Sequence, residues 1–178
     1  MTRLGALFDR FEQFDRTVDA WFDPVRGNPT FDKVAFYASE LADYSMAWHL
    51  AGAGRALLQP SFEREAVRLA IALGVESALV NGAMKPAIGR PRPDGWEEVA
   101  ADVRRPKTAS FPSGHSSSAA MTAVLMTAAP PPLKPLWWGL TGVVAASRIY
   151  NRMHHPSDVA VGLVIGVALG RLTRRLPT

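Results

Sequence analysis

The sequence contains no cysteine among its 178 residues, which excludes disulfide bridges and thiolate metal sites. It also lacks a basic tail or stripe. The net charge of +4 is spread along the chain, so we expect no nucleic-acid partner. The opening residues, MTRLGALFDRFEQFDR, contain acidic residues and no continuous apolar core, and we therefore expect no secretory signal. The length favours a single domain over residues 1–178.

Long uninterrupted apolar runs are scarce as well. Several apolar segments are shorter than the roughly 20 residues that a full membrane span requires. The apolar segments number five in all and cover about 31–58, 66–84, 116–129, 136–147 and 157–170. They predict an all-α protein, a membrane helix bundle of about five to six helices over residues 31–172. Because the first two segments contain Asp43, His49 and Glu76, a buried soluble bundle is the alternative.

Three features favour the membrane bundle. The connection at 130–135 is short and rich in proline. Trp137 and Trp138 occupy the position expected of an interfacial aromatic belt. Glycines repeat every four residues in the last segment, which allows helix backbones to approach closely in lipid; they are Gly162, Gly166 and Gly170.

Residues 1–24 form a further element, an amphipathic helix. Its apolar side contains Leu4, Leu7, Phe8, Phe11, Phe14, Val18, Trp21 and Phe22, and its polar side contains Arg10, Glu12, Asp15, Arg16 and Asp19. Such a helix either packs on a core or lies in the membrane interface. We expect the interfacial position. A short surface helix is also expected after Asp94, within the long connection 86–114.

Three polar clusters interrupt the apolar pattern, each at the end of a segment. They are Lys85 to Pro93, Pro112 to His115, and Ser147 to Asp158. If consecutive segments alternate in direction, the end of the second, the start of the third, the end of the fourth and the start of the fifth lie on one side of the bundle. The clusters are therefore expected to form one site.

The expected site is strongly cationic. Lys85, Arg92 and Arg148 supply three positive charges, and arginine binds phosphate oxygens in a planar, bidentate manner. Ser113 and Gly114 precede a helix start, where backbone N–H groups favour an anion. These features predict a pocket for a tetrahedral oxyanion.

Two histidines can divide the remaining chemistry, because one can attack phosphorus and the other can protonate the departing oxygen. Asp158 follows His154 by four residues, so its carboxylate could accept the Nδ1 proton and leave Nε2 as the nucleophile. A zinc site of His115, His154 and Asp158 is the alternative. Three neighbouring cations would repel a divalent ion, and we expect no metal and no cofactor.

The motifs K-x6-R-P, P-S-G-H and S-R-x5-H-x3-D occur in this order between Lys85 and Asp158. Together they resemble the three-part signature of the type 2 phosphatidic acid phosphatase superfamily. The resemblance implies a metal-independent phosphatase in which His154 forms a phosphohistidine, Asp158 positions it and His115 is the general acid.

The resemblance assigns the remaining motif residues to the phosphate. Lys85, Arg92 and Arg148 would clamp it, while Ser113 and Gly114 would stabilise the trigonal-bipyramidal phosphorus. Arg90 occupies an unspecified position of the first motif, and we expect a solvated loop residue there; contact with lipid headgroups or substrate is the alternative.

The substrate implied by the resemblance is a lipid phosphate or pyrophosphate. Small bacterial members suggest polyprenyl lipids, such as undecaprenyl pyrophosphate or decaprenylphosphoryl-5-phosphoribose; phosphatidic acid and phosphatidylglycerol phosphate stay open. We expect a multi-pass plasma (inner) membrane protein that contacts membrane lipids. Basic residues cluster at the end opposite the pocket, which places the active site on the extracytoplasmic side; they are Arg55, Arg64, Arg68, Lys134, Arg171, Arg174 and Arg175.

Two further classes of protein share the cationic pocket. A non-catalytic lipid-phosphate binder or transporter would need the cations but not the histidine chemistry. A vanadate-dependent oxidase would use the same residues to hold vanadate. The sequence does not define the oligomeric state.

Overall fold

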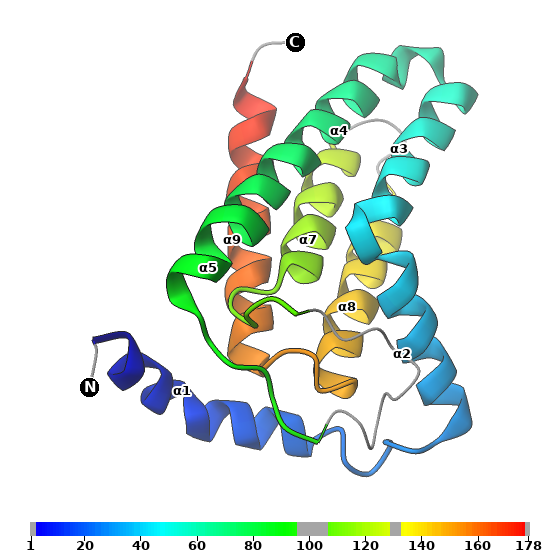
Figure 1. Ribbon diagram of the computed structural model, residues 1–178. Helices are drawn as coiled ribbons and strands as arrows, with labels where there is room; N and C mark the ends of the chain where they lie inside the picture. The colour runs from blue at the N-terminus through cyan, green and yellow to red at the C-terminus, as the bar shows by residue number, and fades with distance from the viewer. Residues whose placement is uncertain (1–2, 96–106, 129–132, 177–178) are drawn as a thin grey trace.

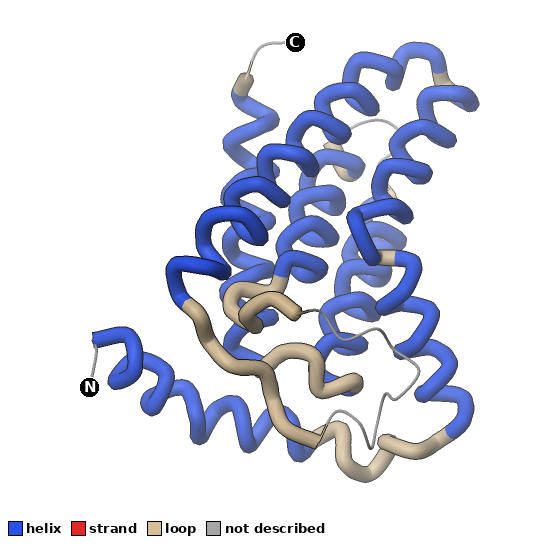
Figure 2. The backbone as a smooth tube through the Cα atoms, in the orientation of Figure 1, coloured by secondary structure: helices blue, strands red, loops and turns tan. Residues whose placement is uncertain are grey.

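The computed structural model describes residues 3–95, 107–128 and 133–176, and within them every regular element is a helix (Figures 1 and 2). The expected surface helix after Asp94 lies outside the described residues. The main helices are α1 (Arg3–Ala20), α2 (Pro29–Leu41), α3 (Met46–Leu58), α4 (Glu63–Ser77), α5 (Lys85–Ile88), α7 (Gly114–Met126), α8 (Lys134–Tyr150) and α9 (Pro156–Arg175). The expected all-α bundle is therefore confirmed.

Helix α7 lies at the centre of this bundle and contacts α3, α4, α8 and α9. Nearly all of its residues are buried, and half of the buried ones are small serines and alanines. A helix without a polar face is buried on all sides. The start of α7, which carries the second motif, is therefore surrounded by the other helices.

The glycine repeat of α9 packs against α7, as expected. A Cβ atom on Gly162 would lie 2.4 Å from the carbonyl oxygen of Ser113, and one on Gly166 would lie 2.1 Å from that of Ser117. These positions leave no space for a side chain. The close approach brings the second and third motifs, at the starts of α7 and α9, together.

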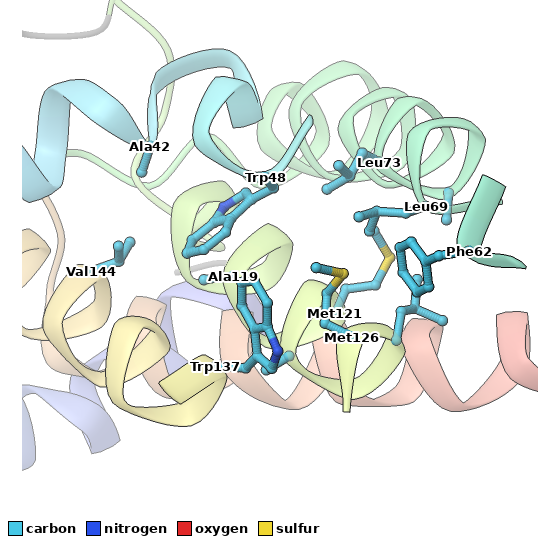
Figure 3. Close-up of a cluster of buried hydrophobic side chains, with 13 residues drawn as sticks. Ala42, Trp48, Phe62, Leu69, Leu73, Ala119, Met121, Met126, Trp137 and Val144 are labelled. Atoms are coloured by element: carbon cyan, nitrogen blue, oxygen red, sulfur yellow. The ribbon is translucent and has the colours of Figure 1, made fainter. Parts of the chain in front are cut away.

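The apolar core lies further along the bundle (Figure 3). It includes Trp48 of α3, Leu69 of α4, Met121 of α7 and Trp137 of α8. The assignment of Trp137 to an interfacial belt was wrong, because its side chain is 8% exposed and packs in this core, whereas Trp138 is 36% exposed. Of the two tryptophans at the start of α8, Trp138 is therefore the one that lies at the surface.

The expected first segment, 31–58, is divided into α2 and α3. A short 3-10 turn, Asp43–Ser45, separates them, and Tyr44 and Ser45 have positive φ angles of 52° and 58°. Such angles are uncommon for residues other than glycine. The break places Asp43 at a bend that faces the start of α7, and its carboxylate reaches His115.

The second segment is one long helical stretch with a change of pitch. Between α4 and α5 the residues Ala78–Met84 form a π-helix, a form that often marks functional sites. Among the described residues, two helical stretches are long and apolar enough to cross a membrane, Pro60–Ile88 and Pro156–Arg175.

Helix α1 lies across the end of the bundle at which α9 begins (Figure 1). Val18, together with Phe22 just beyond the helix, packs against a small apolar cluster of α8 and α9. Phe14 and Trp21 are 47% and 69% exposed, so the expected apolar side is divided between the protein and its surroundings.

Candidate active site

A cavity of about 650 Å³ opens at the end of the bundle where the three motifs meet. Its lining includes Lys85, Arg92, Gly114, His115 and His154, five of the eight residues that the sequence assigned to the site. Because these residues come from α5, the following loop, α7 and the loop before α9, the predicted convergence of distant segments is present.

Arg92 lies beside the proposed nucleophile. Its Nη1 donates to the carbonyl oxygen of Met153 at 2.6 Å and lies 3.4 Å from Nε2 of His154. Its Nε donates to the carbonyl oxygen of Thr108 at 3.0 Å. These contacts fix the guanidinium plane, and a phosphate bound to it would lie next to Nε2.

Arg148 and Lys85 are the other two cations. Arg148 lies near the end of α8 and is 1% exposed; its Nη1 donates to the hydroxyl of Ser39 on α2. Lys85 begins α5, directly after the π-helix, and is 6% exposed. Burial of a cation without an equal opposing charge is costly, which favours the binding of an anion between them.

The first residues of α7 line the cavity. The hydroxyl of Ser113 caps the helix by accepting the N–H of Ser116, at 3.4 Å. The next residue, Gly114, lies against Asn81 of the π-helix, and a Cβ there would lie 2.9 Å from the Asn81 Oδ1. A side chain at this position would displace the Asn81 amide, and glycine leaves the helix N-terminus open to the cavity.

His115 is the next residue of α7. Its Nε2 lies 2.8 Å from Oδ1 of Asp43, at the break between α2 and α3. This hydrogen bond orients the imidazole at the cavity wall. Asp43 is one of the polar residues within the apolar segments of the sequence, and the structure identifies His115 as a partner of its carboxylate.

His154 is held by its backbone and is fully buried. Its N–H and that of Met153 both donate to the carbonyl oxygen of Arg148, at 3.1 and 3.0 Å. Its Nδ1 lies 3.7 Å from Oδ2 of Asp158, an ion-pair separation that is longer than a hydrogen bond. The orientation of Nδ1 by Asp158 stays a prediction, although the two groups are adjacent and Nε2 faces Arg92.

The charge environment keeps His154 neutral. Burial, followed by the positive charges of Arg92, Arg148 and Lys85, holds the pKa of His154 well below its usual value. A neutral imidazole has the lone pair that a nucleophile requires. The cations that would bind phosphate therefore also favour the unprotonated form of the proposed nucleophile.

Asp158 itself has two close partners. Its Oδ2 accepts the N–H of His155 at 2.9 Å, as part of the capping box of α9, and its Oδ1 accepts Nη1 of Arg90 at 2.5 Å. The expectation of a solvated Arg90 was wrong, since this side chain is 7% exposed. No motif signals it, and its second carboxylate partner, Asp15, lies 75 positions away in the sequence.

The zinc alternative required His115, His154 and Asp158 to lie around one point. Within the described ranges no group of three or more potential metal-binding histidine and carboxylate side chains is assembled. His115 instead pairs with Asp43, and Asp158 pairs with Arg90.

The similarity of this chain to known proteins agrees with its fold and its motifs. The sequence profile of the PAP2 superfamily matches residues 65–178. The chain is 32% identical over 144 residues to a decaprenylphosphoryl-5-phosphoribose phosphatase from Mycolicibacterium smegmatis, covering 78% of this chain and 74% of the relative. It is 39% identical over 89 residues to the protein of the same name from Mycobacterium tuberculosis. That match covers 50% of this chain and 49% of the relative, so it spans about half of the relative's length.

Two solved structures share the fold. One is a transmembrane PAP2 type phosphatidylglycerolphosphate phosphatase from Bacillus subtilis, with a TM-score of 0.75, 24% identity and coverage of 96% of this chain and 89% of that chain. The other is Aquifex aeolicus LpxE, with a TM-score of 0.71, 23% identity and coverage of 90% and 94%. The protein belongs to the PAP2 superfamily.

Proposed function

We propose that this protein is a membrane phosphatase that hydrolyses a lipid-linked phosphomonoester or pyrophosphate through a phosphohistidine on His154. The observation that carries the proposal is the arrangement at the cavity. A neutral histidine presents Nε2 beside the guanidinium of Arg92, and two further buried cations lie nearby. Phosphoryl transfer depends mainly on positioning and charge neutralisation, which this arrangement supplies.

The reaction proceeds in two steps. Nε2 of His154 attacks phosphorus, the bond between phosphorus and the leaving oxygen breaks, and His115 gives that oxygen a proton. Water then attacks the phosphohistidine, His115 takes a proton from the water, and inorganic phosphate leaves. Arg92, Arg148 and Lys85 balance the charge of the phosphoryl group throughout, and the N–H groups at the start of α7 bind its oxygens.

A lipid environment is supported by the outer surface of the bundle. Large apolar side chains are widely exposed on α3, α4 and α9, among them Leu57 at 85%, Ile71 at 63% and Val164 at 68%. Exposed apolar surface of this extent marks contact with a membrane or a partner. Together with the two span-length helices it supports a multi-pass position in the plasma (inner) membrane.

The orientation follows from the basic residues. Arg55, Arg64 and Arg68 lie around the junction of α3 and α4, and Arg171 and Arg174 lie at the end of α9, which is the end of the bundle opposite the cavity. Basic residues favour the cytoplasmic side. This distribution supports an active site that faces the extracytoplasmic side.

The proposed substrate is a polyprenyl lipid. The relatives named decaprenylphosphoryl-5-phosphoribose phosphatase support a polyprenyl-phosphoryl pentose phosphate, and undecaprenyl pyrophosphate is the second polyprenyl candidate. Phosphatidic acid and phosphatidylglycerol phosphate serve as the non-prenyl members of the test panel.

The test is phosphate release by the purified full chain in detergent, with EDTA present, from each lipid of this panel. The His154→Ala variant is the matched control. We expect release from at least one polyprenyl substrate by the wild type and none by the variant. Equal release by the variant, or binding without release by the wild type, would contradict the proposal; the second result identifies a lipid-phosphate binder.

A further inference from the structure

Helix α1 carries a buried carboxylate that the proposed reaction does not use. Asp15 is 5% exposed, although Glu12 and Phe14 on the same helix are exposed. The sequence placed Asp15 on the polar side of an interfacial helix. The structure turns it towards the bundle, at the first turn of α9.

The Asp15 carboxylate accepts hydrogen bonds from three groups, and all three belong to residues far away in the sequence rather than to α1 itself. Its Oδ1 accepts the backbone N–H of Ser157 at 2.7 Å. Its Oδ2 accepts the hydroxyl of Ser157 at 2.8 Å and Nη2 of Arg90 at 2.7 Å. Asp15 therefore caps α9 from another helix, because the N–H of Ser157 is one of the groups that the first turn leaves without a partner.

Arg90 continues this network to the active site. Its Nη1 donates to the hydroxyl of Ser157 at 2.7 Å and to Oδ1 of Asp158 at 2.5 Å. The other oxygen of Asp158 lies 3.7 Å from Nδ1 of His154. A continuous path of buried charged groups thus connects α1 to the proposed nucleophile.

The network contains one guanidinium between two carboxylates, and all three groups are more than nine-tenths buried. If Arg90 had Asp158 as its sole acidic partner, it would neutralise that carboxylate. Because Asp15 shares the guanidinium, the two carboxylates and one guanidinium together carry a formal charge of −1. That charge suits a carboxylate that must bind an imidazole proton when the phosphohistidine forms.

The network also fixes backbone at the phosphate site. The carbonyl oxygen of Asp158 accepts the N–H of Ser113 at 3.0 Å, immediately before the start of α7. Movement of the first turn of α9 would therefore shift Asp158 and the loop that holds Ser113 together.

We propose that Asp15 is a positioning residue for the nucleophile: it holds Arg90 and the first turn of α9 so that Asp158 faces Nδ1 of His154. This inference rests on the proposed phosphohistidine mechanism. It makes α1 a structural part of the active site, in addition to any contact that Trp21 and Phe14 make with lipid.

The test compares Asp15→Asn with Glu12→Gln in the full chain. Asparagine keeps the size of Asp15 and an acceptor for Ser157 but removes the charge, while Glu12 is an exposed carboxylate of the same helix that pairs with Arg16. We expect Asp15→Asn to lower kcat by about 10- to 100-fold, the range typical of partners that orient a functional histidine. We expect KM to change by less than about twofold, because the cations that bind phosphate stay in place.

A loss of packing alone would lower the amount of folded enzyme and leave kcat per phosphorylatable site unchanged. The rate of phosphoenzyme formation in a single turnover, normalised to the sites that become labelled, therefore separates positioning from folding. An unchanged normalised rate, an effect on KM alone, or equal kcat values for Asp15→Asn and Glu12→Gln would overturn the inference.

A double-variant cycle with Arg90→Lys provides the second measurement. If Asp15 acts through Arg90, the double variant is no slower than Arg90→Lys alone; independent, multiplicative effects would overturn the inference. Should Asp15→Asn fail to fold, Ser157→Ala takes its place, because it removes the hydroxyl that Asp15 and Arg90 share. We again expect a lower kcat with a nearly unchanged KM. An active His154→Ala variant would refute the proposed phosphohistidine mechanism itself. If that variant is inactive, the kinetics of Asp15→Asn test the positioning role of Asp15 alone.

Discussion

The Nη1 atom of Arg92 lies 3.4 Å from Nε2 of His154, and the same nitrogen donates to the carbonyl oxygen of Met153 at 2.6 Å. The cation and the nucleophilic atom are therefore held by one short stretch of chain. Under the proposed mechanism, a phosphoryl group bound to Arg92 would lie next to Nε2 of His154.

Replacement of Arg92 by lysine tests this relationship. Lysine keeps the charge but cannot donate in a planar fork to phosphate and to the backbone at once. We expect kcat/KM to fall by about 10²- to 10³-fold, the cost of removing one preorganised donor to a transition-state oxygen. The measurement is steady-state phosphate release. Arg64→Lys, at the opposite end of the bundle, is the control and should behave as wild type.

The role of His115 can be separated from that of His154 by the leaving group. A lipid alkoxide requires a proton to depart, whereas p-nitrophenolate leaves readily without one. We expect His115→Ala to lower kcat for a lipid phosphate by about 10²- to 10⁴-fold and to have a much smaller effect with p-nitrophenyl phosphate. His154→Ala should abolish both activities. Equal losses of His115→Ala with both substrates would contradict the assignment of His115 as the general acid.

The close packing of α7 against α9 predicts that a larger residue at the contact lowers the stability of the protein. Gly166→Ala places a Cβ 2.1 Å from the carbonyl oxygen of Ser117, so the helices must separate. We expect destabilisation of about 1–3 kcal/mol, as for other overpacked sites, measured as a lower Tm in detergent. Gly54→Ala in α3 is the matched control, because nothing lies within 4 Å of its Cβ. The control should be neutral or slightly stabilising.

The protonation of His154 gives a prediction that does not depend on substrate. Its pKa lies below the ordinary value of about 6.5, through burial first and the neighbouring cations second. As the pH falls through 6.5, an exposed histidine gains a proton and His154 stays neutral. Imidazole nitrogen shifts in ¹⁵N-histidine-labelled protein, assigned with His154→Gln, should show titration well below pH 6.5. Titration at or above that pH would contradict the expected charge environment.

The sequence predicted which residues line the cavity better than it predicted the contacts between them. Lys85, Arg92, His115 and His154 interrupt apolar segments, so the alternation of helices was enough to bring them to one end. Arg90 was misplaced because a charged loop residue beside proline has the same local pattern whether it is solvated or buried. Its partner Asp15 belongs to a helix whose docking on α9 depends on the tertiary structure.

The backbone details were also beyond sequence reasoning. Neither Tyr44 nor Ser45 is a residue that favours positive φ, so the break between α2 and α3 left no signal. The burial of Trp137 in place of its neighbour depends on the rotation of α8 about its axis, which two adjacent tryptophans do not define. The glycine repeat, in contrast, was informative because only close helix contact requires it.

The most direct test of the account is to trap the intermediate. The full chain is mixed with ³²P-labelled lipid phosphate and quenched in base within the first turnover, because a phosphohistidine survives base and is released by acid. The phosphohistidine mechanism predicts acid-labile label, mapped to the peptide containing His154 and absent from His154→Ala. Phosphate release by the wild type without label on His154, or with label on another residue, would contradict it.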